Sequence, residues 1–197
     1  MTCLICRNEI ICTNLLCYIC WSNINFLKID KASAINSLVI YNSTIRQLIH
    51  IFKYKSPWQI KKIFVNWISL MCNDILSDAE IILSVPMHKL KLISRGYNQM
   101  IVLCNEISQV HKKHFIKDGL EKIRNITSQS VLSQRERLIN IKDSLRINPK
   151  RLDLLKGKKI LIIDDVMTTG ATLAECVQTL GNIPASIKCL SIARTDL

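Results

Sequence analysis

Long apolar segments are missing from this sequence. No run within its 197 residues approaches the roughly 18 apolar residues that a membrane-spanning helix requires. The first residues, MTCLICRNEI, lack the basic and uninterrupted apolar stretches of a secretory signal. We therefore expect a cytoplasmic protein without membrane insertion. Internal repeats and low-complexity tracts are also lacking, and the length suits one α/β domain with a small appendage.

Acidic residues are scarce relative to basic ones. The chain has 15 Asp and Glu against 27 Lys and Arg, a net charge of +12. The excess is local, because residues 86–159 hold 17 basic and 6 acidic residues, whereas the rest of the chain holds 10 and 9. Such a segment can be a solvated face that aids solubility or a surface that binds polyanions. An excess this local favours polyanion binding, for example of single-stranded DNA.

Apolar periodicity predicts strands that alternate with helices. The predicted strands are short apolar runs at residues 33–41, 80–86, 158–164 and 186–194. The predicted helices have helical apolar spacing or length and lie at residues 42–54, 58–76, 98–110 and 172–182. We expect Ser43 or Thr44 near the cap of the first helix. This alternation is typical of a mostly parallel sheet flanked by helices.

The most informative stretch is KKILIIDDVMTTGATLAE. Its four aliphatic residues, Ile160 to Ile163, predict a central strand that is buried on both faces. Asp164 and Asp165 follow at the carboxyl end, where open α/β sheets bind ligands. The next loop, which leads into a helix, contains Thr168, Thr169, Gly170, Ala171 and Thr172. Its N–H groups, its hydroxyls and the positive end of the helix can together hold a phosphate dianion. Gly170 can take a positive φ and let a ligand approach the backbone.

The two carboxylates suit the vicinal hydroxyls of a ribose, and they can help to hold Mg²⁺, which prefers oxygen ligands. The whole stretch resembles the phosphoribosyl pyrophosphate motif of type I phosphoribosyltransferases, with Asp164 and Asp165 as the catalytic acids. The alternative is a structural turn with threonine capping and two surface acids. Two consecutive acids between four aliphatic residues and TTGAT favour the ligand site. A Walker-type nucleotide loop is excluded, because neither GKS nor GKT occurs.

The nine cysteines are divided between a cluster and isolated positions. Cys3 and Cys6 form one CxxC pair, and Cys17 and Cys20 form another. Two such pairs can supply four thiolates to a structural zinc ion, with Cys12 as the spare. A module of about thirty residues needs a clamp of this kind to fold. The alternatives are a redox CxxC or unrelated buried thiols. The four later cysteines have apolar neighbours and are expected to be buried.

The order of the motifs resembles that of one family over essentially the whole chain. A four-cysteine module, IRQLIHIFKY, SVPMHKLKLISRGYNQ and the phosphoribosyl motif follow one another as in the ComF family of competence proteins. The most specific further element is RGYNQ at residues 95–99, where the family usually has RGFNQ after PVP. Ser84 replaces the first proline of that PVP. The family's Arg, Gln and Arg-x-x-Asn pattern is matched by Arg124, Gln129, Arg137 and Asn140.

This resemblance implies a type I phosphoribosyltransferase-like domain at residues 33–197, preceded by a zinc-ribbon-like module at residues 1–32. It also implies a pyrophosphate loop after Pro86 and a hood within residues 111–137. Cations for the pyrophosphate could come from Lys89, Lys91, Arg95 and Arg124, although each can instead be a solvated surface charge. Members of the family are linked to DNA uptake in natural transformation. The implied partners are therefore phosphoribosyl pyrophosphate, single-stranded DNA and other DNA-uptake proteins.

Two functions remain open from the sequence. In the first, the protein is a phosphoribosyltransferase of nucleotide metabolism, but no residue identifies its acceptor. In the second, the same site only binds phosphoribosyl pyrophosphate with Mg²⁺, and the basic segment 86–159 grips a phosphate backbone. Trp58, Trp67 and the tyrosines form no obvious stacking series, so their expected role is core packing and base recognition is not predicted.

Overall fold

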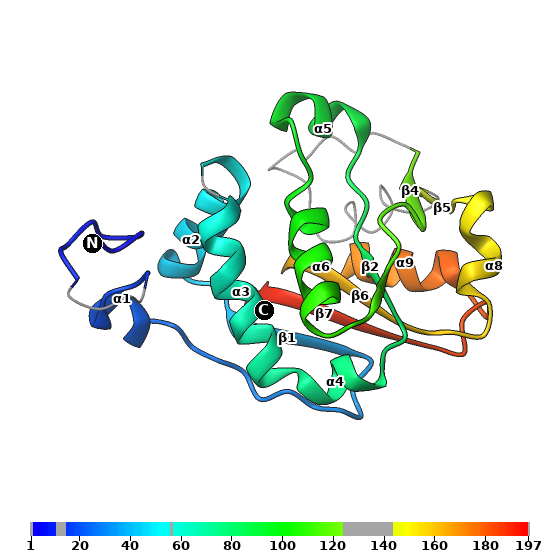
Figure 1. Cartoon of the computed structure of the whole chain (residues 1–197), viewed down its shortest axis with the longest axis horizontal. Helices are drawn as coiled ribbons and strands as arrows, with labels where there is room; N and C mark the ends of the chain where they lie inside the picture. The colour runs from blue at the N-terminus through cyan, green and yellow to red at the C-terminus, as the bar shows by residue number, and fades with distance from the viewer. Residues whose placement is uncertain (1, 11–14, 56, 124–143, 197) are drawn as a thin grey trace.

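The computed structural model describes residues 2–10, 15–55, 57–123 and 144–196. Its centre is a five-stranded sheet in the order β1-β7-β6-β2-β3, in which every neighbouring pair is parallel. The strands of this sheet are β1 (Ile35–Ile40), β2 (Ile81–Ser84), β3 (His114–Phe115), β6 (Lys159–Met167) and β7 (Ser186–Arg194). The parallel sheet flanked by helices confirms the predicted fold class (Figure 1).

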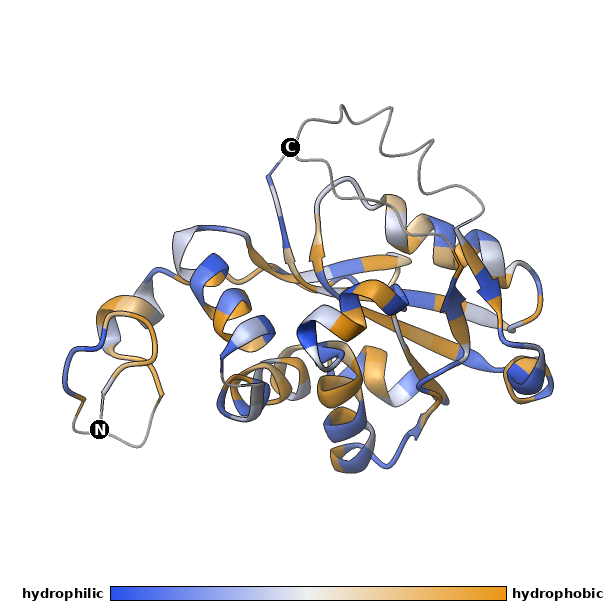
Figure 2. Cartoon of the chain, turned by 90° about the horizontal axis from the view of Figure 1, so that it is seen from above, coloured by the Kyte–Doolittle hydropathy of each residue, from blue (hydrophilic) through white to orange (hydrophobic). Residues whose placement is uncertain are grey.

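Side chains of the central strands alternate between two cores, as the period of two along a strand requires. Leu161 and Ile163 of β6 face one core, and Ile160 and Ile162 face the other. All four are buried, which confirms the strand that the sequence predicts to be covered on both faces. The strands at the middle of the molecule are accordingly mostly apolar in Figure 2.

The first core lies under a layer of four helices, which also pack against one another. These helices are α2 (Ser43–Tyr54), α3 (Pro57–Met71), α4 (Asn73–Asp78) and α6 (Gln99–Val110). The second core lies between the sheet, helix α9 and a small antiparallel hairpin. The elements on that side are β4 (Leu120–Lys122), β5 (Leu145–Ile147), η1 (Pro149–Arg151), α8 (Leu152–Leu155) and α9 (Ala171–Leu180).

The N-terminal residues lie at one end of the molecule, beside helix α2 (Figures 1 and 2). They contain the short helix α1 (Tyr18–Ser22), and their buried side chains belong to the same core as helices α2 and α3. The Trp21 ring contacts Trp67 of α3 edge-on, with ring centroids 5.8 Å apart. Trp67 is 3% exposed, which agrees with core packing, whereas Trp58 is 64% exposed.

Residues 25–27 connect this end of the molecule to the sheet. Leu27 N–H donates to the carbonyl of Leu38, and Ile40 N–H donates to the carbonyl of Asn25. Phe26 forms an antiparallel bridge with Val39. The segment therefore pairs with the free side of β1, which is the outer strand of the sheet on that side.

Three local predictions differ from the structure. Asn42, not Ser43 or Thr44, caps α2, because its side chain accepts from the N–H of Ile45 at 3.0 Å. The long helix expected at residues 58–76 is divided at Cys72 into α3 and α4. The turn expected after β2 contains helix α5 (Lys89–Arg95), which has no buried residue. Within the described residues, no helix has the length and apolarity needed to cross a membrane.

Candidate functional site

Asp164 and Asp165 lie inside strand β6, beyond the point where its neighbour β2 has ended. Strand β2 pairs with β6 only as far as Ser84, which is opposite Ile163. Strand β6 continues to Met167 and pairs there with β7 alone. The sequence places the two acids where the strand leaves the sheet; the structure instead gives them a regular strand backbone. The end of β2 leaves one side of this strand open beside the acids.

Asp165 is held by two side chains from different elements. Lys53 of α2 forms an ion pair with Asp165, with Nζ and Oδ2 2.8 Å apart. Gln99, the first residue of α6, donates from Nε2 to the same oxygen at 2.7 Å. Asp165 is 9% exposed, so these contacts compensate for much of the water that its carboxylate has lost.

Asp164 has a different environment from its neighbour. Its Oδ1 accepts from the N–H of Asp165 at 2.8 Å. The residue is half-buried, yet the protein around its carboxyl raises the pKa to about 7, and the negative charge of Asp165 acts in the same direction. The Asp165 N–H, Lys53 and Lys122 oppose this increase. The two acids therefore differ. Asp165 already has a lysine and an amide side chain as partners, whereas the pKa of Asp164 is close to neutral pH.

A cavity of about 160 Å³ opens next to the two acids. Its charged lining consists of Asp164, Asp165, Lys53, Lys91, Arg95 and Lys122, with His88 at the same opening. Burial lowers the pKa of Lys122, and the positive charge of Lys91 lowers it further. Four cations, which come from α2, α5 and β4, thus face two acids. The excess of positive charge suits a site for a multiply charged anion.

The RGYNQ residues assemble one wall of this cavity. Arg95 ends helix α5, Gly96 follows with φ of +83°, and Asn98 caps α6 through its side chain. Arg95 Nη1 donates to Gln99 Oε1 at 2.6 Å, and Gln99 in turn donates to Asp165. The Tyr97 hydroxyl donates to the Phe52 carbonyl at 2.9 Å, which fixes the motif to α2. The motif therefore orients Asp165 through Gln99, a role that its sequence alone does not disclose.

The TTGAT loop joins β6 to helix α9. Gly170 has φ of +73°, which is the left-handed conformation predicted for it. Thr169 Oγ1 accepts from the Ala171 N–H at 3.4 Å, and Ala171 is buried as the first residue of α9. Thr168 is exposed and Thr172 is half-buried. The loop does not line the cavity beside the acids.

The other predicted anion-binding residues fall in different places. Arg95 and Lys91 line the cavity, whereas Lys89 is exposed at the start of α5 and does not line it. Arg124, Gln129, Arg137 and Asn140 lie outside the described residues. The sequence interpretation missed Lys53, Lys122 and the function of Gln99. Only Gln99 carried a signal, as the last residue of RGYNQ.

The four predicted zinc ligands come together. The Sγ atoms of Cys3, Cys6, Cys17 and Cys20 all lie within 4.8 Å of one another, so the cluster has the donor set of a tetrahedral zinc site. Burial would raise the pKa of the Cys3 thiol, but hydrogen bonds from the backbone of Cys17, Cys6 and Ile5 outweigh it and lower the pKa to about 6. The pKa of the Cys20 thiol is raised instead, by burial and by its contacts with the neighbouring thiols, and the pKa of Cys6 is raised as well, so it is the closeness of the four Sγ atoms that indicates a metal site.

The remaining cysteines have other environments. Cys72, Cys104, Cys176 and Cys189 are buried and unpaired, as predicted for small apolar side chains. Burial raises the pKa of the Cys72 thiol to about 12, which makes it unreactive. Cys12 lies outside the described residues.

The described cations of residues 146–159 are largely neutralised. Five of the six contact a carboxylate in ion pairs, which are Arg146–Glu121, Arg151–Asp118, Lys156–Asp153, Lys158–Glu80 and Lys159–Asp78. Lys150 is the exception within this range. Five cations at the C-terminal end of the segment predicted to bind a polyanion are thus already paired with acids, whereas Lys91, Arg95 and Lys122 of the same segment line the cavity beside Asp164.

The chain is similar in sequence to several known proteins. The family model of the phosphoribosyl transferase domain matches residues 102–195, which include β6, both acids and the TTGAT loop. The DNA utilization protein YhgH of Escherichia coli O157:H7 is 32% identical over 115 residues, or 58% of this chain and 49% of that protein. Competence protein F of Haemophilus influenzae is 25% identical over 71% of this chain and 63% of that protein. Competence protein ComFC of Bacillus subtilis is 27% identical over 81% of this chain and 63% of that protein. The chain spans about half the length of the first relative and less than two thirds of the others.

Proposed function

We propose that the chain is a competence-related protein of the ComF family with a phosphoribosyltransferase fold, and that it binds phosphoribosyl pyrophosphate together with Mg²⁺. The proposal rests on three features that follow one another along the chain. These are the two acids on β6, Gly170 in the left-handed conformation and the start of helix α9. A ribose 5-phosphate carries both hydroxyls and a dianion, the two kinds of group that such acids and such a loop bind. The acids accept from the hydroxyls, and the loop donates to the phosphate.

The asymmetry between the two acids gives each a role. Asp165 is oriented by Lys53 and Gln99 before any ligand arrives, so a ribose hydroxyl meets a prepared acceptor. Asp164 takes part as a carboxylate once a positive charge is near, because a nearby cation favours the ionised form. Mg²⁺, held with the oxygens of the acids and of the diphosphate, would supply that charge.

Lys91, Arg95 and Lys122 form the other side of the same cavity. A pyrophosphate group placed in this cavity would have its charge balanced by these cations and by Mg²⁺. This arrangement favours binding of phosphoribosyl pyrophosphate over binding of ribose 5-phosphate alone. The fragment without pyrophosphate should therefore bind more weakly.

The proposal is tested by isothermal titration calorimetry with phosphoribosyl pyrophosphate and Mg²⁺. Replacing Asp164→Asn together with Asp165→Asn should weaken binding by about 100-fold or more, because two charge-assisted hydrogen bonds and a metal ligand are lost. The matched control is Asp153→Asn, which removes an exposed carboxylate that contacts only Lys156. Circular dichroism verifies the fold of each variant. Equal affinities of the double variant and the control would refute the assignment.

The three cavity cations also favour turnover as a second candidate function. In such a reaction the bond between C1 of the ribose and the pyrophosphate oxygen breaks, a bond from C1 to an acceptor nitrogen forms, and pyrophosphate leaves with its charge stabilised by these cations. The protein would then be an active phosphoribosyltransferase of nucleotide metabolism whose acceptor is unidentified. A panel of bases and amines, assayed for release of pyrophosphate, distinguishes this function from binding alone.

The role of the protein in the cell follows from its relatives. Those relatives are named for competence and for the use of DNA. We infer that this chain acts in the cytoplasm during natural transformation and handles imported single-stranded DNA with other DNA-uptake proteins. Transformation frequency in cells that carry the Asp164→Asn and Asp165→Asn variant measures this role, and a frequency equal to that of the unaltered chain would contradict it.

A further inference from the structure

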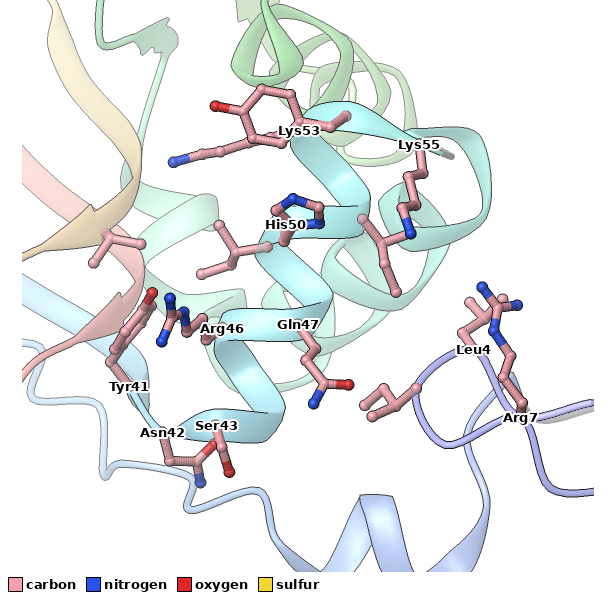
Figure 3. Close-up of a pocket in the computed structure, with 15 residues that line it drawn as sticks. Leu4, Arg7, Tyr41, Asn42, Ser43, Arg46, Gln47, His50, Lys53 and Lys55 are labelled. Carbon is pink, nitrogen blue, oxygen red and sulfur yellow. The ribbon is translucent and has the colours of Figure 1, made fainter.

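A second and larger cavity lies outside the site described above. Its volume is about 820 Å³, and it lies between the four-cysteine end of the chain and helix α2. Leu4, Ile5 and Arg7 form one wall, and the exposed side of α2 forms the other (Figure 3). Cavities of about 300–1,000 Å³ are the usual size for small-molecule and cofactor sites. The space therefore suits a ligand of nucleotide size.

All charged side chains that line this cavity are basic. Its lining includes Arg7, Arg46, His50, Lys53 and Lys55 and contains neither aspartate nor glutamate. Arg46 and His50 are one helical turn apart, so they share a face of α2. Within the described residues, ion pairs are recorded for Lys53 but not for Arg7, Arg46 or Lys55. An anion that enters the cavity would meet cations whose charge is not already balanced.

The cations flank the helix on two sides. In Figure 3, Arg7 and Lys55 point into the gap between the N-terminal residues and the C-terminal end of α2. Arg46 points to the other side of the helix, where Tyr41 lies, and His50 is placed between the two sides. A ligand with more than one phosphate, or with a phosphate and a second polar group, would contact both sides.

Aromatic rings accompany these charges. Tyr41 is half-buried and Tyr54 is 59% exposed, and both line the cavity. The ring of Tyr54 lies 5.1 Å from that of His50, while Arg95 is 4.8 Å from its centroid. Within the described residues, two tyrosine rings thus lie along the same cavity as Arg46 and Lys55, for which no ion pair is seen. Aromatic rings can stack on bases while cations contact phosphates, so this combination suits a nucleotide.

We propose that this cavity binds a nucleotide phosphate ester, either as a free nucleotide or as part of a single strand, and that the four-cysteine module supplies one of its walls. The cavity lies outside residues 86–159, the segment whose composition predicts polyanion binding. It is separate from the proposed phosphoribosyl pyrophosphate site, although Lys53 lines both. The module thus contributes Arg7 to a ligand site as well as stabilising the fold.

The test measures binding of a fluorescently labelled oligothymidylate by anisotropy, with thymidine monophosphate as a second probe. Arg46→Glu should weaken binding of whichever probe binds by about tenfold or more, since a phosphate contact is replaced by repulsion. Lys150→Glu is the matched control, because Lys150 is also an exposed cation without a recorded ion pair but lies in η1. The control should change affinity less than about twofold.

Two further measurements distinguish the sources of the phosphate. Saturable binding of thymidine monophosphate, lost in Arg46→Glu, identifies a free-nucleotide site. Binding of the oligonucleotide alone identifies a strand site, and Arg46→Ala should then reduce the slope of log K against log salt by about 0.7. Either result supports the proposal. Binding of neither probe, or equal losses in Arg46→Glu and Lys150→Glu, overturns it.

Arg7 tests the contribution of the module. Arg7→Glu should weaken binding of the same probe by a similar factor. Arg7→Ala replaces this variant in the test if the glutamate disturbs the nearby thiols. Calorimetry with phosphoribosyl pyrophosphate separates this proposal from the proposed function. Arg46→Glu should leave that affinity within about twofold, whereas Asp164→Asn with Asp165→Asn should leave nucleotide binding intact. A loss of phosphoribosyl pyrophosphate binding without a loss of nucleotide binding in Arg46→Glu would contradict the second site.

Discussion

The cations of residues 146–159 and those of helix α2 differ in what they contact. In the first region nearly every lysine and arginine touches a carboxylate, and those pairs lie at the surface. In the second region Lys53 is paired with a buried acid, and Arg46 and Lys55 line a cavity without acids. A count of charges along the chain therefore does not separate the paired cations of residues 146–159 from Lys91, Arg95 and Lys122 of the same basic segment, which line the cavity beside the acids. The ion pairs, which can be identified only in the folded structure, determine which cations remain available to bind an anion.

The largest expected effect concerns the module that forms one wall of the α2 cavity. Cys6→Ser should remove bound zinc and lower the melting temperature by about 5–10 °C, since a structural zinc site contributes directly to folding. Cys6 is exposed, so the loss would not come from packing. Metal analysis and thermal unfolding measure both quantities.

Cys12→Ser is the control for this experiment, because Cys12 is the spare thiol of the module. It should retain one equivalent of zinc and the melting temperature of the unaltered chain. If Cys6→Ser retained its metal as well, the four-thiolate assignment would be wrong.

A smaller effect on stability is expected from breaking the buried ion pair between Lys53 and Asp165. Lys53→Met leaves Asp165 without its ion-pair partner, next to a second acid, and should destabilise the fold by about 2–3 kcal/mol. Denaturant unfolding measures this change. Lys156→Met, which breaks the exposed pair with Asp153, should leave the midpoint unaltered. Equal changes in the denaturation midpoint of Lys53→Met and Lys156→Met would show that the buried and the exposed ion pair contribute equally to stability.

The smallest effect is a pH dependence at Asp164. Its folded pKa is about 7 and its ordinary value is 3.8, so between these values the folded state holds a proton that the unfolded state lacks. Stability from this group therefore falls as the pH rises from about 4 to 7. In magnesium-free buffer, Asp164→Asn should melt above the unaltered chain at pH 8 and close to it at pH 4. A difference that does not vary with pH would show that the Asp164 carboxyl titrates at its ordinary value.

Much of the architecture could be predicted from local sequence. Four consecutive aliphatic residues specify a strand covered on both faces, and Gly170 is the residue that a left-handed turn before a helix requires. The spacing of the CxxC pairs predicted the cluster of four thiols. In each of these cases the determining residues lie within a few positions of one another, so the information is local.

The contacts that complete the site could not be predicted in this way. Lys53 and Asp165 are 112 positions apart, and nothing near Lys53 distinguishes it from any lysine on the polar side of an amphipathic helix. The break at Cys72 had no glycine or proline to announce it. Lys159 pairs with Asp78 because strands β2 and β6 are neighbours, which is a property of the sheet order and not of either segment.

The pairing of residues 25–27 with β1 has a consequence for the solubility of the protein. These residues cover backbone N–H and C=O groups that would otherwise face solvent along an outer strand. An uncovered strand of this kind is a template for pairing with a second chain. If the neighbouring module holds a zinc ion, removing that ion should loosen this cover, and the demetallated protein should then self-associate through β1.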